Sequence, residues 1–172
     1  MAKKGAGTKE YTHVTHPFPA LYNEESEILI LGSLPSVKSR EQMFFYGHPQ
    51  NRFWKVMAAV LNEPVPQNIE EKKVMLYKHH VALWDTIYSC DIIGSSDSSI
   101  KNVVPTDLKS IVENSKVTRI FCNGKTSGAY FKKYQEKELG IEAEVLPSTS
   151  PANAAYSVEK LVGIWKEKIG KM

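Results

Sequence analysis

The sequence predicts an α/β fold in which parallel strands are covered by helices on both faces. Short apolar runs alternate with segments of helical periodicity along the 172 residues, and this alternation is typical of parallel sheets. Neither an internal repeat nor a low-complexity linker interrupts it. A chain of this length fits one domain with a substantial core. We expect a single domain over residues 21–172, preceded by a flexible N-terminal tail over residues 1–20.

Four apolar runs are the expected strands. The first, "EILILG" (27–32), has the composition of a short, buried strand. "HVALWDTI" (80–87) and "VTRIFCNG" (117–124) have the same character. The fourth segment, "IEAEVLPSTSPAN" (141–153), combines a strand with the loop that follows it.

The segments between these strands predict helices. In "NRFWKVMAAVL" (51–61) the apolar residues recur at helical spacing, and Asn51 is a natural N-cap. Further helices are expected at 69–78, at 107–114 with Thr106 as the cap, and at 126–135. A final helix carries one apolar face, made of Val158, Leu161, Val162, Trp165 and Ile169.

Composition excludes several classes of protein. No run of about 18 apolar residues is present, so we expect no membrane-spanning helix. The start, "MAKKGAGTKEY", has no apolar segment behind its basic residues, which favours a cytoplasmic protein over a secreted one. The formal net charge of +3 permits binding to a polyanion without establishing it. Two cysteines, Cys90 and Cys122, cannot hold a four-cysteine metal site and are interpreted as buried thiols.

Four polar segments follow the expected strands. They are "GSLPS" (32–36), the residues from Asp85 through the hydroxyl-rich loop "SCDIIGSSDSSIKN" (89–102), Asn123 to Lys125, and "PSTSP" (147–151). In parallel α/β sheets, ligands bind outside the carboxyl ends of the strands. We therefore expect these segments to converge on one cleft.

The motifs "GSLPS", "GHPQNRFW", "LWDTIYSC" and "LPSTSPAN", in this order over nearly the whole chain, resemble those of the uracil-DNA glycosylase superfamily. The most similar branch is the hypoxanthine-DNA (deoxyinosine) glycosylase family. The resemblance implies a three-layer α/β/α sandwich around a four-stranded parallel sheet. It also implies a monofunctional enzyme that releases a deaminated base, flipped out of DNA, without a metal or organic cofactor. The implied partner is double-stranded DNA, with single-stranded DNA left open, and we expect a monomer.

Leu34 raises a question about the catalytic water. In uracil-directed relatives the matching residue is an Asp or Asn that positions the attacking water, whereas a leucine has no polar atom for this task. We expect Asn51 to take the role, because a placed neutral amide can orient water beside the sugar C1′. The alternative is that Asn51 is only an N-cap, worth about 1 kcal/mol. Ser148 matches the histidine that stabilises the leaving base in some relatives, and is the second expected catalytic residue.

Asp85 matches the base-reading Asn of uracil-directed relatives. Its carboxylate can accept a hydrogen bond from N1–H of hypoxanthine, and adenine would lose this contact. A backbone N–H or a hydroxyl must then donate to O6. The alternative is that Asp85 turns the chain or pairs with a lysine. Tyr46 is the first choice for the wall against which the base stacks, with Phe44 and Phe45 as neighbours. The other expected base contacts are Gly32, Ser33, Leu34 and His48.

Small polar residues and cations are expected to contact the DNA backbone. For the serines, ordinary turn chemistry is the alternative. Lys38 and Arg40 are further candidate cations. A Schiff-base role for Lys125 is not expected, because nothing marks this lysine as desolvated. Ala152 stands where relatives place a bulky leucine wedge. The expected DNA-binding residues are Pro35, Ser36, Ser39, Arg52, Lys125, Thr149, Ser150, Pro151, Ala152 and Asn153.

Three other functions remain open from the sequence. A uracil- or mismatch-directed glycosylase of the same fold is one, because "HPQNRFW" also resembles the mismatch-specific uracil branch. A catalytically inactive module that binds damaged DNA is the second, and Leu34 supports it. A phosphate-binding α/β enzyme ranks last, because neither GxxxxGK[ST] nor GxGxxG occurs.

Overall fold

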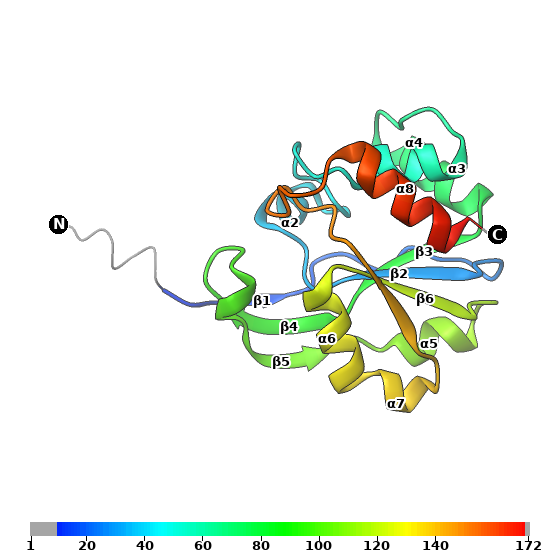
Figure 1. Cartoon of the computed structure of the whole chain (residues 1–172). Helices are drawn as coiled ribbons and strands as arrows, with labels where there is room; N and C mark the ends of the chain where they lie inside the picture. The colour runs from blue at the N-terminus through cyan, green and yellow to red at the C-terminus, as the bar shows by residue number, and fades with distance from the viewer. Residues whose placement is uncertain (1–9, 171–172) are drawn as a thin grey trace.

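A four-stranded parallel sheet forms the centre of the computed structural model, which describes residues 10–170 (Figure 1). Its strand order is β3-β2-β6-β7. The four strands are β2 (Ile28–Gly32), β3 (Val81–Asp85), β6 (Arg119–Asn123) and β7 (Ala143–Leu146). All three pairings are parallel, as the alternation of strands and helices predicts.

Helices cover both faces of this sheet, which confirms the three-layer α/β/α sandwich (Figure 1). One face is covered by α3 (Phe53–Leu61), α4 (Ile69–Lys78) and α8 (Val158–Ile169). The other is covered by α5 (Leu108–Glu113), α6 (Lys125–Tyr134) and the short α7 (Glu136–Leu139). None of the helices within residues 10–170 is long and apolar enough to cross a membrane.

The central strand β2 contributes to a core on each face. Ile28 and Ile30 belong to the cluster that contains residues of α3, α4 and α8. Leu29 and Leu31 belong to the cluster on the opposite face, with Phe131 of α6. Alternate side chains of a strand point to opposite faces, so a strand covered on both sides is apolar throughout. This explains why "ILIL" has no polar position.

A second sheet was not expected from the sequence. It is antiparallel, with the order β1-β4-β5, and consists of β1 (Thr12–Thr15), β4 (Ile87–Ile92) and β5 (Lys101–Pro105). The expected loop 89–102 is therefore wrong: β4 and β5 form a hairpin whose connection includes the short helix η1 (Asp97–Ser99). The expected strand 80–87 is two strands, because the chain leaves the parallel sheet after Asp85 and enters the second sheet at Ile87.

The expected tail over residues 1–20 is too long. Residues 1–9 lie outside the described residues, but β1 pairs with β4, and His16 and Phe18 are buried. The register joins Thr12 to Ile92 and Thr15 to Ser89. A partner so distant in sequence leaves no local signal in "THVT", whose alternation is too short to distinguish a strand from a tail.

Two helix starts differ from the expected caps. Helix α3 begins at Phe53, and Asn51 Oδ1 accepts a hydrogen bond from Phe53 N at 2.9 Å, so Asn51 does cap the helix, from one position earlier. Helix α5 is capped by Asp107 rather than Thr106. The Thr106 hydroxyl instead donates to the backbone oxygen of Asp85 at 2.6 Å.

Both cysteines are free and buried, as expected. Burial raises the pKa of the Cys122 thiol to about 11 and also raises the pKa of Cys90. The two thiols are protonated core residues at neutral pH.

Gln135 joins the two sheets at the point where they separate. Its buried Nε2 donates to the backbone oxygens of Thr86 (3.0 Å) and Thr106 (3.1 Å). We expect Gln135→Met to lower the free energy of unfolding by about 2–3 kcal/mol, because both buried carbonyls lose a donor. The matched control is Gln67→Met, whose Nε2 donates to an exposed carbonyl. Chemical denaturation measures both, and equal values for the two variants would contradict the assignment.

Candidate active-site cleft

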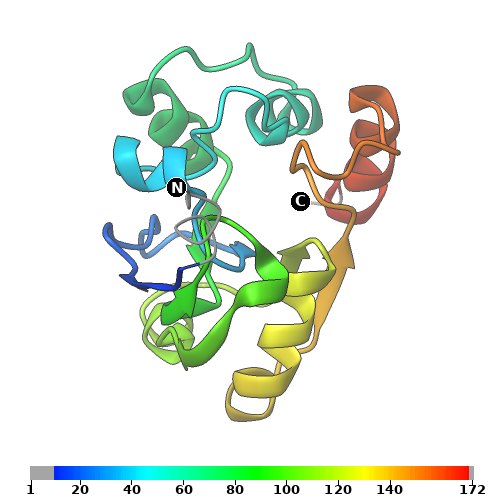
Figure 2. The same ribbon diagram turned by 90° about the vertical axis from the view of Figure 1, so that its left-hand side faces the viewer.

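A cleft of about 910 Å³ lies at the carboxyl ends of the parallel strands. Figure 2 looks onto this side, with the loop after β7 (orange) and the segment leading into α3 (cyan) above the start of α6 (yellow). The four polar segments converge there, as expected. The expected site residues that line the cleft are Gly32, Ser33, Leu34, Pro35, Ser36, Ser39, Tyr46, Asn51, Asp85, Lys125, Ser148, Thr149, Ser150, Ala152 and Asn153.

Three expected site residues do not line the cleft: His48, Arg52 and Pro151. His48 makes a local contact instead, because its Nδ1 accepts from Gln50 N at 3.1 Å. Pro151 is exposed on the loop after β7. The base contact of His48 therefore stays a prediction that the cleft lining does not support, and Arg52 has a different role that is described below.

Asp85 forms the floor of the cleft. It is 3% exposed, and its Oδ2 accepts from Nε2 of the buried His16 at 2.6 Å. Its other carboxylate oxygen, Oδ1, lies over Gly32, where a Cβ atom would be only 2.5 Å away. Only glycine leaves room for this approach. His16 was missed from the sequence, because 69 residues separate it from Asp85.

Tyr46 places a hydroxyl beside the same glycine. A Cβ atom on Gly32 would lie 3.3 Å from the Tyr46 hydroxyl oxygen. This oxygen is buried and makes no hydrogen bond of normal geometry, although the Asn123 side chain lies near enough to lower its pKa slightly. Burial, and secondarily the nearby Asp85 carboxyl, raise the pKa of Tyr46. One ring face is stacked on Phe53, with centroids 4.0 Å apart. The cleft floor therefore offers a protonated hydroxyl donor next to a carboxylate acceptor.

Asn51 is held by a hydrogen-bonded chain that runs across the cleft. Its Oδ1 accepts from the Thr149 hydroxyl at 2.8 Å, in addition to Phe53 N. Asn123, at the end of β6, donates from Nδ2 to the Thr149 hydroxyl (3.0 Å) and accepts from Thr149 N (3.0 Å). An amide oxygen has two lone pairs, and both face protein donors here.

The Arg52 guanidinium fastens the loop after β7. It donates to the backbone oxygens of four loop residues, and it is not a free cation for DNA, contrary to expectation. The Arg52 backbone N also donates to Thr149 O at 3.1 Å. The four acceptors are the oxygens of Thr149 (3.3 Å), Ser150 (2.7 Å), Asn153 (3.0 Å) and Tyr156.

The same loop is also bonded to itself. Ser148 Oγ accepts from Ser150 N at 3.1 Å, and Ser150 Oγ accepts from Ala152 N at 3.1 Å. Asn153 Nδ2 donates to Ser148 O at 3.0 Å. Gly124, with a φ of +101°, faces Ser148, whose Cβ would be 3.1 Å from a Cβ there. Turn chemistry thus accounts for the acceptor side of these serines, and the Ser148 hydroxyl proton remains able to donate into the cleft.

Leu34 has a structural reason to be apolar. Besides lining the cleft, it packs on the small core of the antiparallel sheet, which contains Ile87, Cys90 and Ile92. Ser36 and Ser39 next to it are used locally. Ser36 Oγ caps α2 (Val37–Gln42), and Ser39 Oγ accepts from Gly47 N at 2.8 Å.

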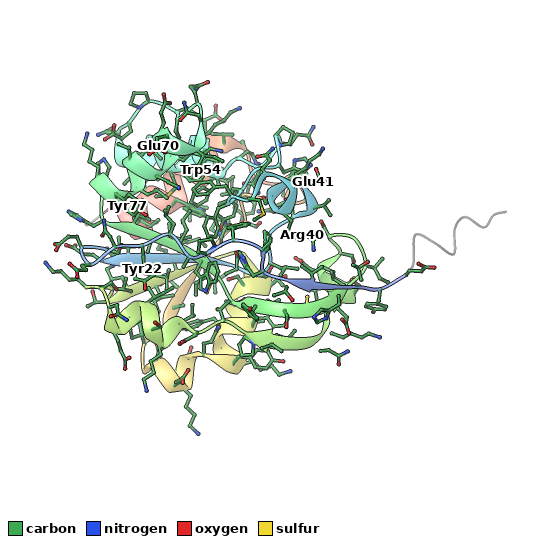
Figure 3. All side chains as sticks on the ribbon, turned by 180° about the vertical axis from the view of Figure 1, so that it is seen from behind. Tyr22, Arg40, Glu41, Trp54, Glu70 and Tyr77 are labelled. Carbon is green, nitrogen blue, oxygen red and sulfur yellow. The ribbon has the colours of Figure 1, made fainter. Side chains whose placement is uncertain are left out.

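The other expected cations differ in whether their charged groups contact other protein groups. Lys125 is exposed at the cleft. Lys38 lies 3.7 Å from Glu41 on the surface. Arg40, labelled in Figure 3, donates to Gly94 O at 3.3 Å, and burial lowers its pKa. Within residues 10–170, no group of three or more His, Cys, Asp or Glu side chains is placed to hold a metal ion.

Replacement of Arg52 by lysine tests whether the hydrogen bonds from its guanidinium hold the loop after β7 in place. A lysine keeps the charge but cannot reach four carbonyls with one planar fork. We expect Arg52→Lys to lower the unfolding free energy by about 2 kcal/mol and to make the amides of residues 148–156 exchange faster with solvent. Lys55→Ala, at an exposed position of the same helix, is the control. Unchanged hydrogen exchange in the loop of Arg52→Lys would contradict this role.

Comparisons with known proteins agree with the geometry. Residues 19–168 match the model of the uracil DNA glycosylase superfamily. A hypoxanthine DNA glycosylase of Methanosarcina acetivorans is 37% identical over 142 residues, covering 81% of this chain and 89% of that protein. A hypoxanthine DNA glycosylase of Methanosarcina barkeri is 34% identical over 79% of this chain and 86% of that protein.

A solved structure supports the same relationship. The solution NMR structure of a putative uracil DNA glycosylase from Methanosarcina acetivorans superposes with a TM-score of 0.76 at 32% sequence identity. The match covers 91% of this chain and 98% of that chain. Because the family model spans most of the sequence and the fold agrees, this chain belongs to the uracil-DNA glycosylase superfamily.

Proposed function

We propose that this protein is a monofunctional DNA glycosylase that hydrolyses the N-glycosidic bond of hypoxanthine in DNA. The observation that carries the proposal is the acceptor–donor pair over Gly32, formed by Asp85 Oδ1 and the Tyr46 hydroxyl. The names of the two Methanosarcina relatives, which match most of the chain, support the same substrate.

The pair matches the lactam edge of the base. Hypoxanthine presents an N1–H donor beside an O6 acceptor. Asp85 Oδ1 accepts from N1–H, and the Tyr46 hydroxyl donates to O6. The raised pKa of Tyr46 keeps this hydroxyl protonated at neutral pH, so it remains a donor. Adenine presents an unprotonated N1, which leaves Asp85 Oδ1 without a donor at a buried site. Its amino group can still donate to the Tyr46 oxygen, so the lost N1 contact is the basis for rejection.

Bond cleavage requires water and a departing base. The water oxygen bonds to C1′ while the C1′–N9 bond breaks, the electron pair leaves with hypoxanthine, and a proton from water completes the free base. Asn51 Oδ1 orients the water once the Thr149 hydroxyl turns aside, because a hydroxyl proton can rotate and release the second lone pair. The Ser148 hydroxyl donates a hydrogen bond to the departing base and so stabilises its negative charge. Fixed neutral dipoles suffice because the sugar becomes cationic and the base anionic.

The cleft walls supply the remaining contacts. Phe45 lines the cleft beside Tyr46 and provides the aromatic wall for the flipped base, because a Tyr46 ring whose hydroxyl meets O6 in the plane of the base does not also stack on it. Lys125, exposed at the rim, pairs with a phosphate, and the hydroxyl-rich loops contact the adjacent backbone. We assign duplex DNA as the substrate and a monomer as the active form. The two free thiols fit a reducing, cytoplasmic compartment.

Uracil is the second candidate base. Its N3–H and O4 present the same donor and acceptor order as N1–H and O6 of hypoxanthine, so the Asp85–Tyr46 pair alone accepts both. The two candidates differ in ring size. The names of the two Methanosarcina relatives with sequence matches favour the purine, whereas the solved structure is named as a putative uracil DNA glycosylase. A panel of substrates decides between them.

The first experiment measures base release from duplexes that contain hypoxanthine, uracil, xanthine or only normal bases. We expect wild type to release hypoxanthine fastest, and Asn51→Ala to lower kcat/KM by about 100-fold or more. Asn51→Ala also removes a cap, worth about 1 kcal/mol of stability. Asn68→Ala is the matched control, because Asn68 caps α4 through Glu71 N at 2.8 Å away from the cleft.

The outcomes separate the candidates. Equal losses of activity in Asn51→Ala and Asn68→Ala would reduce Asn51 to a cap. Release of uracil alone would replace the substrate. Tight binding of damaged duplex without release of any base would make the protein an inactive binding module.

The Tyr46 hydroxyl gives a second test, in which stability and activity move in opposite directions. We expect Tyr46→Phe to raise the unfolding free energy by up to about 1 kcal/mol, because it removes a buried hydroxyl without a partner. Its kcat/KM for hypoxanthine falls by about 10- to 100-fold, because O6 loses its donor. Tyr77→Phe is the control, since Tyr77 packs on the core away from the cleft (Figure 3). Wild-type kinetics in Tyr46→Phe would exclude the hydroxyl from base reading.

A further inference from the structure

His16 lies directly behind the base-reading carboxylate. It follows β1 of the antiparallel sheet, and its side chain is 0% exposed. The ring packs against Phe18, with centroids 4.7 Å apart, and against Trp84, with centroids 4.2 Å apart. Its Nε2 donates to Asp85 Oδ2 at 2.6 Å, whereas its Nδ1 is buried without a partner. The ring therefore directs its one hydrogen bond in the structure to Asp85.

This hydrogen bond makes the two oxygens of the Asp85 carboxylate different. Oδ2 is engaged by His16 in the interior, and Oδ1 over Gly32 is the oxygen at the cleft. Among the hydrogen bonds of residues 10–170, none has Asp85 Oδ1 as its acceptor. We propose that His16 sets the polarity of base recognition: by donating to Oδ2 it fixes position 85 as a single acceptor aimed at the cleft, and so selects bases that present a ring N–H. This inference rests on the proposed reading of the lactam edge by Asp85.

The same histidine would orient an amide placed at position 85. With His16 in the tautomer that protonates Nε2, an asparagine there would turn its oxygen toward the His16 N–H, because two facing donors in a buried site are unfavourable. Its NH₂ group would then face the cleft and meet the N1–H of hypoxanthine, donor against donor. Without the His16 donor, the same amide could rotate and present its oxygen to the base. Removal of His16 should therefore improve the activity of an enzyme that already carries Asp85→Asn.

The experiment compares wild type with Asp85→Asn, His16→Leu, His16→Gln and the double variant His16→Leu/Asp85→Asn on a hypoxanthine duplex. We expect Asp85→Asn to lose about 100-fold or more in kcat/KM. The double variant recovers at least about tenfold over Asp85→Asn, a gain equal to one regained hydrogen bond. His16→Gln, whose Nε2 reaches as far as that of histidine, stays within about fivefold of wild type, while His16→Leu falls by about tenfold or more.

A matched control comes from β1, just before His16 in the chain. His13 Nδ1 lies 2.9 Å from Asp91 Oδ1, so β1 carries a second His–Asp pair, but on the surface. His13→Leu should leave kcat/KM and the base preference as in wild type. If His16→Leu does not fold, the comparison of Asp85→Asn with the double variant still decides, because neither of them contains an unpaired buried carboxylate. Thermal unfolding identifies the folded variants.

The outcomes distinguish this inference from the proposed function. Absence of hypoxanthine release by wild type would overturn both. Full activity in Asp85→Asn would overturn base reading by Asp85 and the role of His16 with it. Loss in Asp85→Asn without recovery in the double variant would overturn the role of His16 alone.

Discussion

The contact between the start of α3 and the loop after β7 is the constraint on which the rest of the site depends. The loop from Pro147 to Ser157 contains no strand or helix, so its backbone polar groups need partners from elsewhere. The Arg52 guanidinium donates hydrogen bonds to four of these backbone oxygens. Its neighbour in the chain, Asn51, accepts a hydrogen bond from the hydroxyl of Thr149 in the same loop. Two neighbouring residues thus hold a segment about 100 positions further along the chain, and they do so at the place where the water and the departing base would lie.

Charge is used sparingly at this site. Many of the polar groups that line the cleft are amides and hydroxyls, and its charged side chains are Asp85 at the floor, Lys125 at the rim and Asp97. A carboxylate at the base edge has a cost in the proposed reaction, since the departing base gains negative charge. The hydrogen bond from His16 draws charge density toward Oδ2, on the side away from the base. The hydrogen bond from the buried His16 to Asp85 would therefore reduce the repulsion between this carboxylate and the departing base in the proposed reaction.

The parallel sheet and the position of the cleft could be predicted because their signals are local. "ILIL" is apolar at every position because both faces of β2 are covered, and Asp85 ends a similar run. The antiparallel sheet could not be predicted in the same way. In "VALWDTI" only Thr86 separates β3 from β4, so the segment has the pattern of one continuous strand. The serines and Asp91 in β4 and the hairpin have the composition of a loop. Arg52 was interpreted as a DNA contact because a sequence does not reveal which carbonyls a guanidinium will meet.

The position of His16 just after β1 has a consequence for the order in which the protein is completed. During synthesis β1 leaves the ribosome before its partner β4, which follows some 70 residues later, as does Asp85. Until then the histidine has no carboxylate and the strand has no neighbour. The parallel sheet needs β6 and β7, which are made later still. Asp85 thus obtains its hydrogen-bond partner from a segment made well before it, and the proposed base reading requires both segments in place.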